Sequence, residues 1–274
     1  MKIALIALFV SLMAVPAQAQ ERKVRYLTNY ENEPYHFGFL VAFNQMMFNI
    51  KTVESYQNVQ LPGNSQTWPD ASEEWSPQNT DHLNVYKVET EKGPGFTVGI
   101  IGSKRLGRYF DLRFTPTLSF GERRINYSVA IFESGNLEPK EVKETHSGGN
   151  MSINTVIAEF PLHIKYRSKR YNNIGAYLIG GINPKRDFAI QKKKDADDPS
   201  SVNQQLNTRR FDIAAEVGVG FDIYNQWFKM GVELKMSYGL LDIMTHSATA
   251  TPTIYTAPID QLHNKILQFS LIFE

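Results

Sequence analysis

Charged side chains recur at every second position along several stretches of this 274-residue chain, with apolar residues between them. Three of the charged residues, Glu159, Glu216 and Glu233, are carboxylates of the kind that act as general acids or bases in enzymes. Cations follow the same spacing, so the alternative is a structural network of paired charges, and this is the interpretation we favour. The full set comprises Arg113, Glu159, Lys165, Asp212, Glu216, Lys229, Glu233 and Lys235.

The histidines are the next candidates for catalysis. His146 and His246 each directly precede a serine, and adjacent residues cannot face each other as a nucleophile and its base must. His163 alternates with apolar residues, which indicates a hydrogen-bonded structural histidine beside the charged set. We therefore expect no catalytic residues and a protein that is not an enzyme.

The residue types also argue against metals, cofactors and nucleic acids as ligands. The chain has no cysteine, and it contains no glycine-rich phosphate loop, zinc-ligand spacing or calcium loop. Its 29 basic and 28 acidic residues produce no net field that would attract nucleic acid. We expect no metal, no cofactor and no nucleic-acid partner. The basic run 192–194 is predicted to be a solvated loop tip, with contact to lipopolysaccharide or to a partner as the alternative.

A period of two is the spacing of a β-strand, whose successive side chains point to opposite faces. Pro161 falls within one such stretch and predicts a bulge there. The pattern predicts eight strands, at 36–48, 95–103, 110–132, 154–167, 174–187, 210–224, 228–240 and 265–274.

One face of these strands is apolar, and alternation alone does not decide whether that face lies inside or outside. A soluble periplasmic barrel or sandwich would bury it, whereas a membrane barrel would turn it toward lipid. The length of the strands favours lipid, because a tilted membrane strand needs ~9 to 11 residues and globular strands usually have ~5 to 6. The residues predicted to face lipid are Phe211, Val217, Val219, Phe221, Met230, Val232, Leu234, Leu267, Phe269 and Leu271, and aromatic residues near strand ends, among them Tyr166, Tyr224 and Trp227, are predicted to form interfacial girdles.

The first residues predict export. Lys2 is followed by the apolar run 3–15 and by a small-residue site at 17–19, so we expect a signal peptide at 1–19 with cleavage after Ala19. Beyond it no run of ~18 apolar residues predicts a membrane helix, so a membrane protein of this sequence has to be a closed β-barrel.

Short and long links alternate between the predicted strands, as in outer-membrane barrels. We therefore expect an all-β fold, an eight-stranded up-and-down antiparallel transmembrane β-barrel with long extracellular loops and short periplasmic turns. Its lumen is only wide enough for side chains to fill. The expected organisation is an N-terminal periplasmic segment at 20–34 and the barrel domain at 35–274, with a long first loop at about 49–94.

Several segments together resemble the PorT family of outer-membrane barrels from Bacteroidetes, also called SprT in gliding bacteria. The similarity extends over roughly 94–274, outside the first strand and the loop that follows it. The segments are Pro94-Gly95-Phe96, 106–114, 159–170, Gly180-Gly181, 220–224, 238–240, Ile259-Asp260 with Leu262, and 270–274.

The resemblance implies a non-enzymatic component of the type IX secretion system, which exports proteins with C-terminal secretion signals and also serves gliding motility. Its implied partners are other components of that system, within outer-membrane lipid and lipopolysaccharide. Two alternatives stay open, a general small outer-membrane barrel with structural or ligand-binding loops, and an outer-membrane hydrolase.

Overall fold

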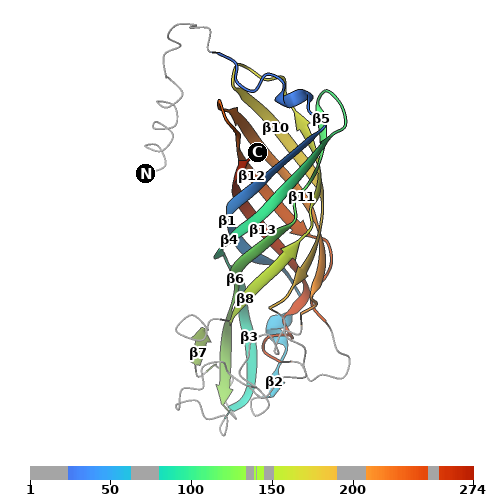
Figure 1. Ribbon diagram of the computed structural model, residues 1–274. Coiled ribbons are helices and arrows are strands. Elements are labelled where there is room, and N and C mark those ends of the chain that lie inside the picture. The colour runs from blue at the N-terminus through green and yellow to red at the C-terminus, as the bar shows by residue number, and fades with distance from the viewer. Residues whose placement is uncertain are drawn as a thin grey trace, which may run out of the picture.

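The computed structural model describes residues 24–62, 80–133, 139, 141–144, 151–189, 208–245 and 253–274. Its strands join into one antiparallel sheet that closes on itself as a ring with eight strand positions (Figure 1). Around the ring the positions are β1 (Tyr35–Thr52), β4 (Gly93–Arg105), β5 (Phe110–Phe114) with β6 (Thr117–Glu133), β8 (Met151–Glu159) with β9 (Leu162–Arg167), β10 (Ile174–Asp187), β11 (Phe211–Tyr224), β12 (Lys229–Gly239) and β13 (Ile259–Phe273).

Each ring strand pairs with its neighbour in chain order, and the pairing of β13 with β1 closes the ring. The eight predicted strands correspond to these eight positions, and the predicted bounds 174–187 are those of β10. The links 106–109, 168–173 and 225–228 lie at one end of the ring, together with the segment 24–34 and the C-terminus (Figure 1). We call this the short-turn end.

Two ring positions are interrupted by proline, which has no amide hydrogen to donate to a neighbouring strand. Pro116 separates β5 from β6, and Pro161, where a bulge is predicted, separates β8 from β9. The carbonyl oxygens of both prolines still accept hydrogen bonds, from the amides of Ile100 and Thr115, each at 3.1 Å. The ring therefore stays hydrogen-bonded through both interruptions.

The prediction of one long loop at about 49–94 is wrong in its last part. Residues 80–91 form β3 (Thr80–Glu91), which pairs with β6 and continues through Lys92 into β4. A bulge between Val85 and Lys87 shifts the alternation within β3, which explains why a search for period two misses it. The smaller elements are η1 (Tyr30–Asn32), η2 (Tyr56–Asn58), β2 (Leu61–Pro62) and β7 (Glu141–Glu144).

The β3–β4 and β5–β6 arms form a hairpin that extends beyond the ring, at what we call the hairpin end (Figure 1). Along β6 the two faces exchange polarity there. Within the ring the inner face carries Ser119 and Arg123 and the outer face carries Leu118 and Phe120. Beyond the ring the buried face carries Ile125, Tyr127, Val129 and Ile131, and the opposite face carries Glu122, Arg124, Asn126 and Ser128.

The apolar face of the hairpin arms packs into a core of its own. Tyr127 on β6 meets Tyr255 at 5.4 Å between ring centroids, and its hydroxyl donates to the Tyr255 carbonyl oxygen at 3.1 Å. Burial raises the pKa of both tyrosines well above the usual value, so both hydroxyls stay neutral. The cluster comprises Phe48, Leu61, Leu83, Val85, Ile125, Tyr127, Val129, Ile131, Ile153, Ile243, Met244, Ile254, Tyr255, Ile259 and Leu262.

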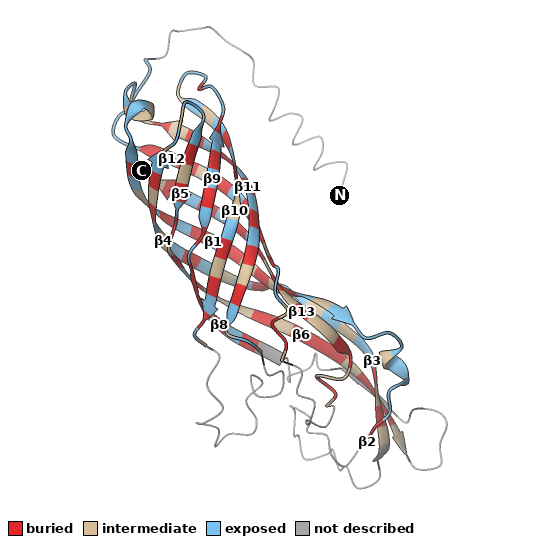
Figure 2. Ribbon diagram, turned by 90° about the vertical axis from the view of Figure 1, so that its right-hand side faces the viewer, coloured by how far each residue is buried: buried red, intermediate tan, exposed pale blue. Residues whose placement is uncertain are grey.

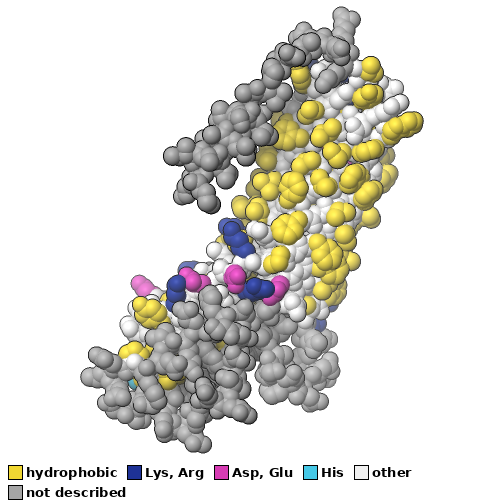
Figure 3. Space-filling view, turned by 90° about the vertical axis from the view of Figure 1, so that its left-hand side faces the viewer, with side chains coloured by type: hydrophobic (Ala, Val, Ile, Leu, Met, Phe, Trp, Pro, Cys, Tyr) yellow, Lys and Arg dark blue, Asp and Glu magenta, His cyan; other side chains and the backbone are white. Residues whose placement is uncertain are grey.

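The surface shows the same change of polarity. Exposed apolar side chains cover the wall of the ring, and charged side chains gather where the wall meets the hairpin end (Figure 3). Buried and exposed residues alternate along the ring strands (Figure 2). The ring therefore has an apolar outer wall and a polar interior, and the hairpin end has the opposite arrangement.

Inner-face glycines provide a test of this packing. A Cβ atom at Gly220 would overlap the Tyr177 ring and lie 2.8 Å from the Val232 carbonyl oxygen, whereas one at Gly175 on the neighbouring strand would meet only Tyr224, at 3.9 Å. We expect Gly220→Ala to cost about 1 to 3 kcal/mol of stability through overpacking, and Gly175→Ala to change little. Urea unfolding in detergent measures both, and equal stability of the two variants would contradict the described interior.

Candidate functional site: a charge-paired interior

The structure places all eight residues of the predicted charged set on the inner face of the ring, where each is buried. They come from four of the eight ring positions, and residues distant in sequence become partners. Arg113 and Glu233, for example, are 120 residues apart in the chain and 2.7 Å apart in space. The alternation in the sequence locates these residues, and the closure of the ring brings them together.

Near the short-turn end the interior contains ion pairs arranged around an aromatic ring. Arg113 donates to Glu233, which also accepts from the Tyr177 hydroxyl at 3.0 Å. Lys165 donates to Asp222 at 2.6 Å, and its Nζ lies 3.7 Å from the centre of the Tyr177 ring. Lys229 pairs with Glu274, the last residue of the chain.

Glu216 is the centre of the middle group. One of its carboxylate oxygens lies 2.7 Å from His163 Nε2 and 2.9 Å from Lys235 Nζ. The other accepts from Asn183 at 2.7 Å and lies 3.8 Å from Lys185 Nζ. Asn183 also donates to Glu159 at 2.6 Å, so the two carboxylates share this amide as well as the lysine.

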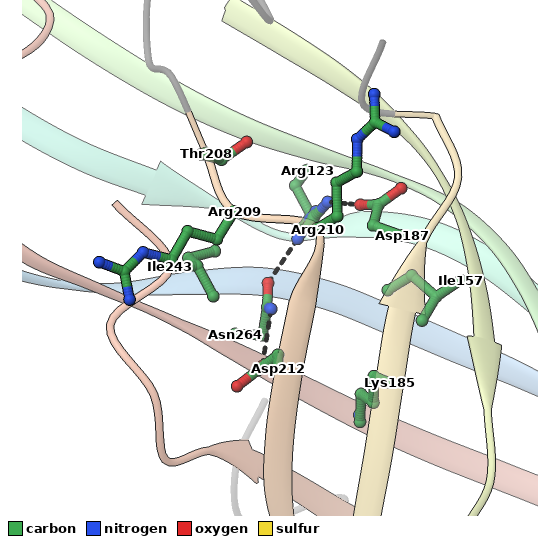
Figure 4. A pocket seen from close by; sticks show the side chains of 10 residues that line it. All are labelled: Arg123, Ile157, Lys185, Asp187, Thr208, Arg209, Arg210, Asp212, Ile243 and Asn264. Atoms are coloured by element: carbon green, nitrogen blue, oxygen red, sulfur yellow. Dashed lines mark hydrogen bonds and ion pairs between the residues drawn. The ribbon is translucent and has the colours of Figure 1, made fainter. Parts of the chain in front are cut away.

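The third group closes the interior toward the hairpin end. Arg123 donates to Asp187 at 2.6 Å and to Asn264, which in turn donates to Asp212 at 2.8 Å (Figure 4). The cavity beside this chain of contacts has a volume of about 10 Å³, which is room for roughly one water molecule. Figure 4 shows Arg209 and Arg210 extending away from the contacts in opposite directions.

Buried cations and carboxylates balance over the described part of the ring together with Arg170, which lies in the link 168–173 at its short-turn end. A buried charge without a counter-charge costs several kcal/mol, so this balance is a condition for folding. The buried cations are Arg113, Arg123, Lys165, Arg167, Arg170, Lys185, Lys229 and Lys235. The buried carboxylates are Asp111, Glu159, Asp187, Asp212, Glu216, Asp222 and Glu233, and the Glu274 side chain, 1% exposed, makes eight against eight.

Sequence reasoning missed half of these charges. Asp222 lies between Phe221 and Ile223 on a predicted strand, so the same period of two identifies it. Lys185 and Asp187 lie on either side of the charged Arg186, which interrupts the apolar alternation there. Asp111 and Arg167, which pair at 2.7 Å, lie at the ends of the predicted strands 110–132 and 154–167, where the alternation extends in one direction only.

The interior is a network of paired charges, and His163 is part of that network. Its Nε2 faces Glu216, and among the described residues no hydroxyl group bonds to its ring. The buried hydroxyls of Ser119 and Ser237 are bonded to Glu159 and Lys185. His146, His246, the run 192–194 and the predicted signal peptide lie outside the described residues.

The segment before β1 lies across the short-turn end. Arg170 donates to the carbonyl oxygens of Tyr26 and Asn172 and to the Asn173 side chain, and its guanidinium stacks 3.8 Å from the centre of the Tyr224 ring. Tyr224, predicted to lie in an outer girdle, is buried and donates to Glu31 at 3.2 Å. That prediction is wrong, because the even-numbered residues of β11 point inward.

Tyr30 belongs to the same cap. Its ring stacks on His36 at 4.2 Å between centroids and lies 4.9 Å from Lys229 Nζ. Burial, with Glu274 and Asp222 nearby, raises the pKa of Tyr30 far above its usual value, so its hydroxyl stays neutral. The cap therefore adds an aromatic layer to the charged interior at this end.

The residues predicted to face lipid all lie on the outer wall. Phe211, Val217, Val219, Phe221, Leu234, Leu267, Phe269 and Leu271 are exposed, and Met230 and Val232 are half-buried between neighbouring side chains. Of the predicted girdle residues, Tyr166 and Trp227 are exposed, Trp227 at 83%. The outer wall is thus apolar over the strands for which this prediction was made.

Comparisons with known proteins identify a family with this architecture. No helix among the described residues has the length and apolar character needed to cross a membrane. The family model described as "Outer membrane protein beta-barrel domain" matches residues 17–245, most of the chain. The chain belongs to this family. No curated protein matches the sequence of this chain.

Membership of the outer-membrane β-barrel family identifies a general outer-membrane barrel protein. The family match ends before β13, yet β13 pairs with both β1 and β12. The ring of this barrel protein is therefore completed by a strand outside the matched region, and Glu274 at the end of that strand enters the interior network.

The charge network makes a direct prediction. Glu216→Gln removes the charge that faces His163, Lys185 and Lys235, and we expect a loss of about 3 to 5 kcal/mol, the usual cost of breaking a buried ion pair. Glu89→Gln, at the exposed Lys87–Glu89 pair, is the control and should change stability by less than about 0.5 kcal/mol. Urea unfolding in detergent measures both. Equal stability of the two variants would mean that the interior network contributes little.

Proposed function

We propose that the ring crosses the outer membrane with its apolar wall in lipid, its short-turn end in the periplasm and its hairpin end outside the cell. Export by the predicted signal peptide at 1–19 is part of this proposal. The outer-face residues from Phe110 to Phe120 support it, because roughly 11 residues tilted by about 45° span roughly 25 Å, the height of the apolar band of such barrels.

The exchange of faces along β6 supports the position of the boundary. A strand surrounded by lipid needs an apolar outer face, whereas a strand in water needs an apolar face toward its own core. Glu122 and Arg124 begin the polar outer face, and they pair with each other at 2.6 Å. Lys51 and Asp260 pair at 3.2 Å, also near the hairpin end. We infer that lipid ends at this level.

We further propose that the protein is a non-catalytic component of the type IX secretion system, required for surface delivery of proteins with C-terminal secretion signals. The resemblance of residues 94–274 to PorT barrels suggests the system. The observation that carries a contact role is the filled interior, whose buried charges balance and whose described cavity has room for about one water molecule. A closed interior leaves the ends and loops as working surfaces, where other components of the system would bind.

The alternative is a general small barrel with structural or ligand-binding loops. The breadth of the matching family favours it, because the family description names a barrel domain and no particular process. The hairpin end, with its own apolar core, is the surface that such a barrel would present outside the cell.

Deletion of the gene separates the two proposals. We expect the deletion strain to lose surface delivery of proteins with C-terminal secretion signals, and a plasmid copy to restore it. Normal delivery in the deletion strain would eliminate the secretion role and leave the general barrel. A copy with His146, His163 and His246 replaced together should also restore delivery, provided that it folds. Loss of delivery by a folded histidine variant would favour a hydrolase.

The membrane placement has its own test. Val232 lies on the outer wall between Phe221 and Leu271, so Val232→Arg places a charge in lipid at a cost of about 2 to 4 kcal/mol. We expect this variant to fail to assemble, as judged by the difference in gel mobility between boiled and unboiled outer membranes. Val232→Ala is the matched control and should assemble. Normal assembly of Val232→Arg would mean that this face does not meet lipid.

A further inference from the structure

Three exposed cations lie on neighbouring strands and links at the short-turn end. Lys104, near the end of β4, stands directly opposite Tyr35 on β1 and Leu112 on β5, and its Nζ lies 5.9 Å from the centre of the Tyr35 ring. Arg108 is in the link between β4 and β5, and Lys169 is in the link after β9. The two links are neighbours, because the Arg167 amide donates to the Tyr109 carbonyl oxygen at 2.8 Å.

Among the described residues these cations have no carboxylate partner, in contrast to several cations at the hairpin end. At the hairpin end Lys51 pairs with Asp260, and Arg124 pairs with Glu122. Within the described residues no ion pair involves Lys104, Arg108 or Lys169. Asp111, which follows Arg108 in the chain, points inward to Arg167, and Glu33, which precedes β1, is exposed.

The wall next to these cations is apolar and aromatic. Phe110 stands opposite Tyr166, with their ring centroids 5.2 Å apart, and Leu112 stands opposite Ile164. Phe110, Tyr166 and Ile164 are each about half exposed, and Leu112 is half-buried. The cations therefore border a continuous apolar surface on β5 and β9, and we name Lys104, Arg108 and Lys169 with this surface the basic wall patch.

We propose that the basic wall patch binds an anionic phospholipid of the periplasmic leaflet, with the phosphate at the three cations and an acyl chain along Phe110, Tyr166 and Ile164. Cations next to the lipid-facing part of a membrane protein bind anionic head groups, and aromatic residues gather at that depth. The position of Lys104 selects lipid over a protein partner, because it lies on the outer wall in one row with Tyr35 and Leu112. The inference rests on the proposed membrane placement and does not depend on the secretion role.

Native mass spectrometry of the purified full-length protein in detergent tests this site. The probes are phosphatidylglycerol and phosphatidylcholine with the same acyl chains, and inorganic phosphate is a third, lipid-free probe. We expect the protein to retain phosphatidylglycerol in preference to phosphatidylcholine. The Lys104→Gln, Arg108→Gln, Lys169→Gln triple variant should lose this preference, with affinity falling roughly fivefold for each cation removed.

Two further variants complete the design. Lys104→Arg with Lys169→Arg keeps the charges and should keep the preference, and Lys51→Gln removes an exposed cation at the other end and should have no effect. All variants are first checked for the gel-mobility shift on boiling, so that only folded protein is compared. This comparison leaves the membrane placement to the Val232 variants and the secretion role to the gene deletion, so each idea can fail separately.

Three outcomes would overturn the proposal. One is retention of phosphatidylglycerol by the folded triple variant at the wild-type level. Another is displacement of the lipid by inorganic phosphate at equal concentration, which would identify a site for free phosphate. The last is unchanged lipid retention together with loss of a bound acidic protein from outer-membrane extracts, which would assign the patch to a protein partner.

Discussion

The pairing of charges inside the ring is the interaction on which the rest of the structure depends. Eight carboxylates and eight cations, counting Arg170 in the link 168–173, are buried in the ring and at its short-turn end, and a buried charge costs several kcal/mol if it lacks a counter-charge. Partners such as Arg113 and Glu233 meet only when the ring has closed, so pairing and closure require each other. The same pairing fills the interior with side chains, and this directs attention from the middle of the ring to its two ends.

The register of the strands follows from the same constraint. Side chains alternate with a period of two, so a slip of one residue in β5 would put Arg113 on the outer wall and Phe114 in the interior. Both changes are unfavourable, and every ring strand with a charged inner face resists slippage in the same way. Beyond the ring β6 keeps the alternation of its side chains, but its inner face becomes apolar and its outer face becomes polar. One uninterrupted strand is therefore suited to two environments that require opposite faces.

The sequence was sufficient to predict all eight ring positions and the inner location of eight charged residues, because both depend on local alternation. Three features escaped prediction, each for a physical reason. The bulge between Val85 and Lys87 changes the phase within β3 and hides this strand from a search for period two. Tyr224 is an aromatic residue of the kind found in interfacial girdles, but it lies on the inner face of β11 with the other even-numbered residues. Its position in the alternation predicts its location better than its residue type does. The partner of each charge depends on ring closure, as with His163 and Glu216, which are 53 residues apart.

The two ends of the ring meet their surroundings in different ways. At the hairpin end an apolar core lies beneath a polar surface on which several cations, among them Lys51 and Arg124, are paired with carboxylates. At the short-turn end the cap is held by polar contacts of Arg170 and Asn173, and the neighbouring wall carries cations without described carboxylate partners. An exposed positive charge without a partner costs little free energy in water, but it attracts nearby anions. The interior is balanced, whereas this local excess of cations lies on the outer wall beside Tyr35 and Leu112, where an anionic partner can reach it.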